Sequence, residues 1–115
     1  MIRLKRAYDP AEATDGHRVL VERLWPRGVT KAKLRLDEWN KDVAPSPELR
    51  TWFGHDPERW PEFRRRYFTE LRANHESWKA LLALSRRRRV TFIYAAHDTA
   101  HNGALALKAF LEKQP

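Results

Sequence analysis

The chain has 115 residues and a hydrophobic fraction of 42%, which is enough for one domain with a buried core. It contains no cysteine, which excludes a disulfide framework, a thiolate zinc site and a cysteine nucleophile, and which suits a reducing compartment. The net charge of +8 favours anionic partners. Residues 1–6 include three basic side chains and lack the apolar run of a signal peptide, and no apolar run reaches the roughly 18 residues needed to span a bilayer. We therefore expect a cytoplasmic protein without a membrane partner.

The first part of the chain predicts strands joined by loops. Residues 2–7 alternate apolar and basic side chains, which is typical of a half-buried strand. A second strand is predicted over residues 18–24, after a turn. Residues 25–28 form a loop, and residues 30–34 one helical turn. Residues 38–43 are either a short strand or an irregular segment.

The middle of the chain predicts helices with clear boundaries. Ser46 is an N-cap, Pro47 follows at the first helical position, and Gly54 ends this short helix. Asp56 begins the next helix in the same way. Its aromatic residues recur at helical spacing, and Asn74 separates it from another helix.

The last part predicts a buried strand followed by a helix. Residues 90–96 are almost all apolar, as in a central strand covered on both faces. A helix should run from about Ala100 to Lys113, with Asp98 or Thr99 as its N-cap. Strands at both ends of a helical middle predict an α/β fold: a compact three-layer single domain over residues 1–115, with a small, mainly parallel sheet flanked by helices.

The loop after the last strand is the first candidate site. Ligands of open α/β sheets gather beyond the carboxyl ends of the strands. His97, Asp98 and His101 are the candidate catalytic residues, and Asn102 is a candidate ligand-binding residue. The alternative is that Asp98 or Thr99 only caps the helix and both histidines lie on the surface. No third metal ligand accompanies the two histidines, so we predict neither a metal nor a cofactor.

The loop after the second strand is the other candidate site. The guanidinium groups of Arg23 and Arg27 suit a planar or phosphorylated anion, and Trp25 offers a ring surface beside them. A structural role fits equally well. In that case Trp25 belongs to the core, and Arg23 forms a buried ion pair with one of three nearby acids: Glu22, Asp37 or Asp42.

Three functions are compatible with these patterns. The first is a pocket for a phosphorylated or carboxylated small molecule, with or without catalysis, formed jointly by the two loops. The second is a nucleic-acid-binding module that uses the basic surface, although no nucleic-acid-binding motif is present. The third is an interaction domain whose exposed aromatic residues form a dimer patch. The usual catalytic signatures are missing, and the oligomeric state is not predictable.

Three ordered segments, residues 18–31, 39–56 and 94–103, resemble the YeaO-like branch of the DUF488 family over essentially the whole chain. This resemblance implies fold and kinship and no particular activity. In cysteine-bearing relatives, the loop after the last strand resembles a segment that ends in Cys-His-Arg. Here Tyr94 stands in the place of the first cysteine, and Asn102, Gly103 and Ala104 stand in the place of Cys-His-Arg. Thiol chemistry therefore does not carry over.

Overall fold

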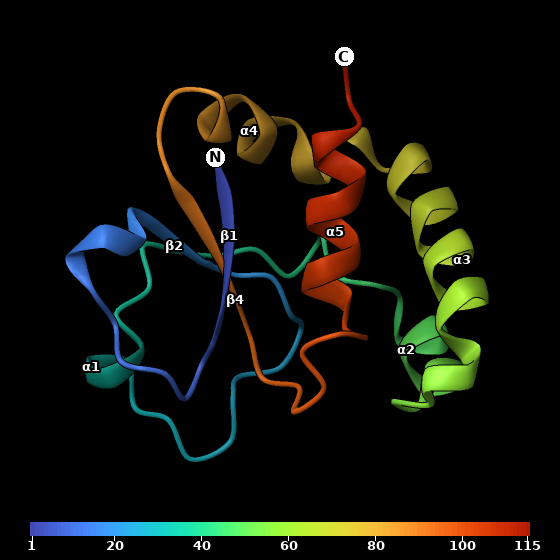
Figure 1. Ribbon diagram of the computed structural model, residues 1–115, viewed down its shortest axis with the longest axis horizontal. Coiled ribbons are helices and arrows are strands. Elements are labelled where there is room, and N and C mark those ends of the chain that lie inside the picture. The colour runs from blue at the N-terminus through green and yellow to red at the C-terminus, as the bar shows by residue number, and fades with distance from the viewer.

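The computed structural model describes residues 1–115 and contains a parallel sheet in the strand order β1-β4-β2-β3 (Figure 1). Its strands are β1 (Ile2–Arg6), β2 (His17–Leu20), β3 (Glu38–Trp39) and β4 (Val90–Tyr94). All three strand pairs are parallel, so the carboxyl ends of the strands meet at one edge. The α/β fold with a small parallel sheet is confirmed.

Five α-helices flank this sheet: α1 (Lys31–Leu34), α2 (Pro47–Phe53), α3 (Trp60–Ala73), α4 (His75–Ser85) and α5 (Gly103–Glu112). Two 3₁₀ turns precede β2 and α3, η1 (Ala13–Asp15) and η2 (Pro57–Arg59). Figure 1 shows α3 and α5 on one side of the sheet and α1 on the other. None of the helices is long and apolar enough to cross a membrane.

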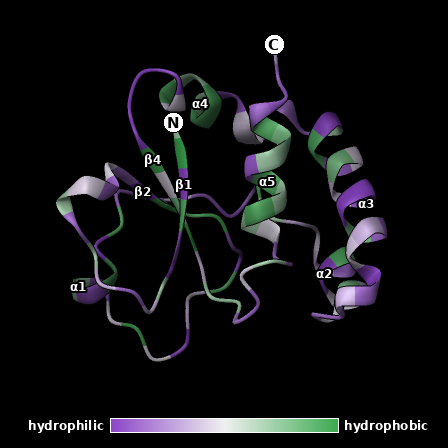
Figure 2. Cartoon of the chain, viewed as in Figure 1, coloured by the Kyte–Doolittle hydropathy of each residue, from purple (hydrophilic) through white to green (hydrophobic).

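The core is divided by the sheet, because successive strand residues point to opposite faces. Val19 and Phe92 belong to a cluster of 19 buried residues shared with α2 to α5. Leu20 and Ile93, their chain neighbours, belong to a cluster of four on the α1 side. Figure 2 shows the contrast, with apolar residues along α5 and a hydrophilic α1. We call the two sides the helix-covered face and the thin face.

Two predicted boundaries are wrong. The second strand ends at Leu20 rather than Leu24, because the Glu22 carboxylate, rather than a backbone carbonyl, accepts the next hydrogen bond from β4. The last helix begins at Gly103 rather than near Ala100. Its N-cap is Asn102, whose Oδ1 accepts from the Leu105 amide at 2.8 Å, so neither Asp98 nor Thr99 caps it.

Thr30 accepts from the Lys33 amide and caps α1, a role that was not predicted from the sequence. The predicted caps of α2 are confirmed, and Ser46 accepts from the Leu49 amide at its start. Gly54 ends α2 in the left-handed conformation. These local signals depend on a few neighbouring residues, which is why the sequence alone located them.

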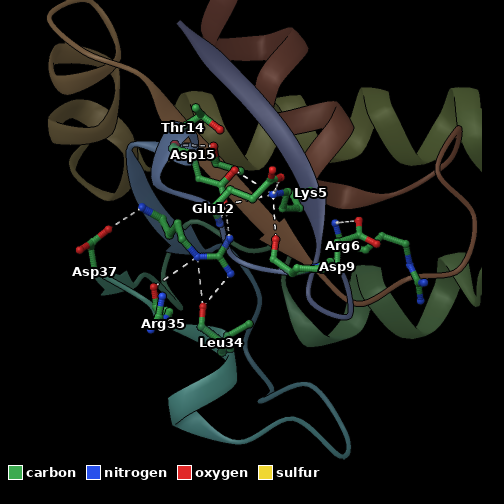
Figure 3. Close-up of polar contacts among 12 residues, drawn as sticks. Lys5, Arg6, Asp9, Glu12, Thr14, Asp15, Leu34, Arg35 and Asp37 are labelled. Atoms are coloured by element: carbon green, nitrogen blue, oxygen red, sulfur yellow. Dashed lines mark hydrogen bonds and ion pairs between the residues drawn. The ribbon is translucent and has the colours of Figure 1, made fainter.

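A buried charged network on the thin face was not predicted. Asp15 and Arg18 are 3% and 4% exposed, and Arg18 Nη1 lies 2.6 Å from Asp15 Oδ2. Lys5 reaches the same carboxylate from β1, at 2.9 Å, and Figure 3 shows Lys5 between Glu12 and Asp15. Burial by itself would raise the pKa of Asp15, but hydrogen bonds from Lys5, the Glu12 amide and Arg18 outweigh it and hold that pKa below its usual value.

Candidate functional site

Two polar side chains lie side by side on the helix-covered face at the carboxyl edge of the sheet, and a third follows the neighbouring strand. Arg6 ends β1 and Tyr94 ends β4, and the two are direct partners in the parallel register. Tyr94 belongs to the helix-side core cluster, and alternation along β1 places Arg6 on the same face. Arg23 follows β2, on the other side of Tyr94 in the strand order. The site is therefore built by three neighbouring parallel strands.

Tyr94 is buried to 4% exposure and makes no hydrogen bond within the protein. The only fully enclosed side-chain nitrogen or oxygen without a partner is Nε of Arg89, so the Tyr94 hydroxyl opens to solvent. Burial raises the pKa of Tyr94; nearby Arg6 opposes this effect, whereas Asp9 and Asp98 add to it. This hydroxyl is thus a neutral donor with no protein partner, in charged surroundings.

Arg6 binds the loop that follows β4. Its Nε donates to the Ala96 carbonyl at 2.9 Å and its Nη2 to the Ala95 carbonyl at 3.2 Å. The Nδ1 atom of His97 lies 3.5 Å from the same Nη2. Arg6 therefore fixes the loop and brings a positive charge to the edge of the site.

Arg23 is half-buried and has free hydrogen-bonding capacity. Its Nε donates to the Pro45 carbonyl at 3.1 Å, and its two terminal nitrogens have no protein partner. The ring of Pro45 packs close to Gly103, since a Cβ on that glycine would lie 3.4 Å from it. Pro45 therefore connects Arg23 to the start of α5. The alternative of a buried ion pair between Arg23 and a nearby acid is wrong.

Asp98 and His101 are hydrogen-bonded to each other in the loop before α5. His101 Nδ1 lies 2.8 Å from Asp98 Oδ2, and both side chains are about one-third exposed. The hydrogen bond from His101 lowers the pKa of Asp98. Asp98 Oδ1 also accepts from the Ala100 amide at 2.9 Å, and the edge of the Trp60 ring packs against the imidazole.

Asn102 is buried, and its side-chain amide is used by the fold. Its Oδ1 caps α5, and its Nδ2 donates to the Asp98 carbonyl at 3.0 Å. Neither atom is free for a ligand. His97 is exposed next to Arg6, on a different part of the loop from the pair formed by Asp98 and His101.

Trp25 and Arg27 lie apart from these residues, toward the thin face. The Trp25 ring packs against the four-residue cluster, and its Nε1 donates to the Val29 carbonyl at 2.6 Å. The Arg27 carbonyl accepts from the Tyr8 hydroxyl at 3.1 Å, while its side chain is exposed without a partner. The chain passes from one face of the sheet to the other between Arg23 and Trp25.

The two clearest hollows in the surface contain none of the predicted site residues. One, of about 390 Å³, lies between α2 and α3, where Trp52 and Glu70 form part of its wall. The other, of about 330 Å³, lies near the chain termini, beside Met1 and Gln114. No three His, Asp or Glu side chains come together in a group that could hold a metal ion.

Sequence reasoning missed Arg6, Tyr94 and Glu22. Strand alternation would have placed Arg6 on the face of Ile2, and the resemblance already singled out Tyr94. Glu22 is half-buried next to the loop after β4. Burial raises its pKa, and the hydrogen bond from the Ala95 amide and the charge of Arg50 oppose the shift. Its role depends on a contact 73 residues away along the chain, which no local pattern reveals.

Comparison with known proteins relates this chain to one family. A family model described as the inactive DUF488-N3 subclade matches residues 1–115. The Escherichia coli K12 protein YeaO, named as uncharacterised, is 44% identical over 110 residues, covering 96% of both chains. An uncharacterised protein of Mycobacterium tuberculosis H37Rv is 43% identical over 112 residues, covering 96% of this chain and 92% of its own length. No solved structure gives a significant match.

Proposed function

We propose that this chain, which belongs to the inactive DUF488-N3 subclade of the DUF488 family, binds a small phosphorylated or carboxylated molecule at the carboxyl edge of its sheet. The observation that carries the proposal is the Tyr94 hydroxyl, which belongs to a side chain almost completely buried and has no protein partner. A polar group so placed requires a partner, which solvent or a ligand supplies.

Arg23 supplies the charge in this proposal. Its free terminal nitrogens form a fork that matches the oxygens of a phosphate or carboxylate, and the bond from Nε to Pro45 holds the fork in place. Arg6 adds a second positive charge from the opposite side of Tyr94. The first amides of α5 favour an anion in the same region.

Binding without catalysis is the form of the proposal that we favour. The matching family is described as inactive, and the chain has no cysteine to act as a nucleophile. The single observation in favour of catalysis is the contact between His101 and Asp98, which resembles a base held by its orienting carboxylate. In that alternative, His101 moves the proton and Asp98 orients the imidazole, whereas His97 lies next to Arg6.

Thermal unfolding with added inorganic phosphate or citrate tests the proposal, because a ligand of the folded state raises the melting temperature. We expect Tyr94→Phe and Arg23→Gln each to weaken the anion about tenfold or more, as expected for one hydrogen bond to a charged group. Arg72→Gln, an exposed arginine on α3, is the control and should bind like the parent. Equal weakening in the control, or no stabilisation of the parent by either anion, would overturn the proposed site.

Hydrolysis of p-nitrophenyl phosphate separates binding from catalysis. We expect no turnover by the parent protein above background. Turnover that disappears in His101→Asn while phosphate binding persists would establish the catalytic alternative.

A further inference from the structure

A second charged surface lies on the thin face. It meets the site at Tyr94 at Tyr8, because the Arg6 guanidinium lies 4.9 Å from the centroid of the Tyr8 ring. Residues 23–36, which include α1, contain five Lys or Arg residues and no acid. Four of these five side chains are exposed, and none of the four forms an ion pair: Arg27, Lys31, Lys33 and Arg35. We call residues 23–36 the basic segment.

The cations of α3 differ, because acids on the same helix neutralise several of them. Glu62 forms ion pairs with both Arg65 and Arg66, each at 2.7 Å. Just before the helix, Asp56 lies 3.6 Å from Arg59. The positive potential around the arginines of α3 is therefore weaker than their number suggests. The basic segment has no such compensating acids and keeps its full charge.

The basic segment is held rigidly against the sheet. Buried Arg18 donates to the carbonyls of Leu34 and Arg35, which end α1. The bond from Trp25 to Val29 closes the loop before α1, and Thr30 caps the helix. The exposed cations thus project from a fixed base, so little ordering is needed when they bind a partner.

Exposed aromatic surface borders this segment. Of the four large hydrophobic side chains that remain exposed, three are Tyr8, Leu24 and Trp39, at 47%, 59% and 37%. Tyr8 touches the segment through the Arg27 carbonyl, at 3.1 Å. Trp39 touches it through the Trp25 ring, with 5.4 Å between ring centroids. A cation already lies over each of these two rings: Arg6 over Tyr8 at 4.9 Å, and Lys41 over Trp39 at 4.1 Å. A base would therefore stack on the remaining exposed surface of each ring. A rigid cationic strip with such aromatic surfaces at its border suits a strand of phosphates with unpaired bases.

We propose that the basic segment, together with Tyr8 and Trp39, binds single-stranded nucleic acid. The four exposed cations contact phosphates, and the two aromatic side chains stack on bases. A second copy of this chain fits less well, because it would bring the same uncompensated positive charge to the interface.

Fluorescence anisotropy with a labelled oligothymidine of about 20 nucleotides tests this proposal. Four phosphate contacts predict that the logarithm of the association constant falls with the logarithm of salt with a slope of about −2.8. Replacing all four exposed cations of the basic segment by glutamine should abolish most of the affinity and bring the slope close to zero.

The matched control replaces four exposed cations elsewhere by glutamine: Arg72, Lys79, Arg87 and Arg88. Both quadruple variants lower the net charge from +8 to +4. The control should keep most of the affinity and the slope of the parent. Equal loss in the two variants would mean that net charge alone attracts the oligonucleotide, and this would overturn the proposal.

Stacking and partner class are tested with the same assay. Tyr8→Leu should weaken the oligothymidine about fivefold or more, whereas Tyr8→Phe, which keeps the ring, should not. We expect a duplex of the same length and a poly-glutamate chain to bind at least about fivefold more weakly than the single strand. No binding of the single strand, or equal binding of the duplex or of poly-glutamate, would overturn the proposal.

Discussion

The Glu22 carboxylate accepts a hydrogen bond from the Ala95 amide, with 2.9 Å between Oε1 and the nitrogen. This contact replaces the next backbone bond between β2 and β4 and ties the loops after the two strands together. Arg23 follows directly and turns toward Pro45. The geometry of the proposed anion site therefore depends on this contact.

Two substitutions of Glu22 separate the contribution of its hydrogen bond to stability from the contribution of its charge. Glu22→Ala leaves the Ala95 amide without its partner and should lower the free energy of unfolding by about 1–2 kcal/mol. Glu22→Gln keeps an acceptor and removes a buried charge, so it should be at least as stable as the parent at pH 7. Chemical denaturation of both variants checks this, and a Glu22→Gln variant as unstable as Glu22→Ala would contradict it.

The difference in stability between the parent and Glu22→Gln should change with pH in a defined direction. Burial raises the pKa of Glu22 in the folded protein. The parent therefore gains stability relative to Glu22→Gln as the pH falls through this raised pKa, and the difference should vanish below the unfolded pKa of about 4. A difference that grows toward acid pH would mean that the carboxylate stabilises the fold in its charged form.

The buried pair of Asp15 and Arg18 should have the opposite dependence. Because the pKa of Asp15 is lowered in the folded state, its stabilising contribution is present above about pH 4 and is lost as the pH falls through the lower folded value. Asp15→Asn should cost about 3–5 kcal/mol at pH 7, since it leaves Arg18 buried without a counter-charge. Exposed Asp42→Asn is the control and should change stability little.

Two glycines with similar positive φ angles should respond differently to alanine. Gly16 has φ +68° and Gly28 has φ +77°, so a side chain strains both. A Cβ at Gly16 would lie 2.3 Å from the Arg89 carbonyl oxygen, whereas nothing lies within 4 Å at Gly28. Gly28→Ala should cost about 1–2 kcal/mol, and Gly16→Ala clearly more. Equal costs in thermal melts would mean that the turn before β2 is less tightly packed.

Replacing the N-cap residue Asn102 tests where α5 begins. Asn102→Ala should cost about 1 kcal/mol or more, because it removes the cap and a second bond to the Asp98 carbonyl. Thr99→Ala, the exposed control, should have no measurable effect. If Thr99→Ala lost more stability than Asn102→Ala during urea unfolding, the helix would begin near Ala100, as predicted from the sequence.

Much of the fold was predictable because its signals are local. Alternation in β1, the apolar run of β4 and the caps of α2 at Ser46 and Gly54 each depend on a few neighbouring residues, and the structure confirms them. The early end of β2 was not predictable, because Val21 still has strand character. The contact from Glu22 to Ala95, distant in sequence, decides where pairing stops.

The candidate site was only partly predictable for the same reason. Parallel strands correctly brought the loops after β2 and β4 to one edge. The face that each side chain reaches depends on where the chain passes from one face of the sheet to the other. It does so between Arg23 and Trp25, so Trp25 and Arg27 lie toward the thin face, apart from Arg23. Tyr94 lay in an apolar run, where its hydroxyl gave no sign of lacking a partner.

The most direct test of the proposed anion site is a titration of ¹⁵N-labelled protein with inorganic phosphate, followed by NMR. We predict saturable shifts of the Gly103 and Ala104 amides at the start of α5, and little change at Gly28 or Lys33 on the thin face. The same titration of Tyr94→Phe should require about tenfold more phosphate for the same shifts. Shifts confined to residues 27–35, or no saturable shift at the start of α5, would contradict the account.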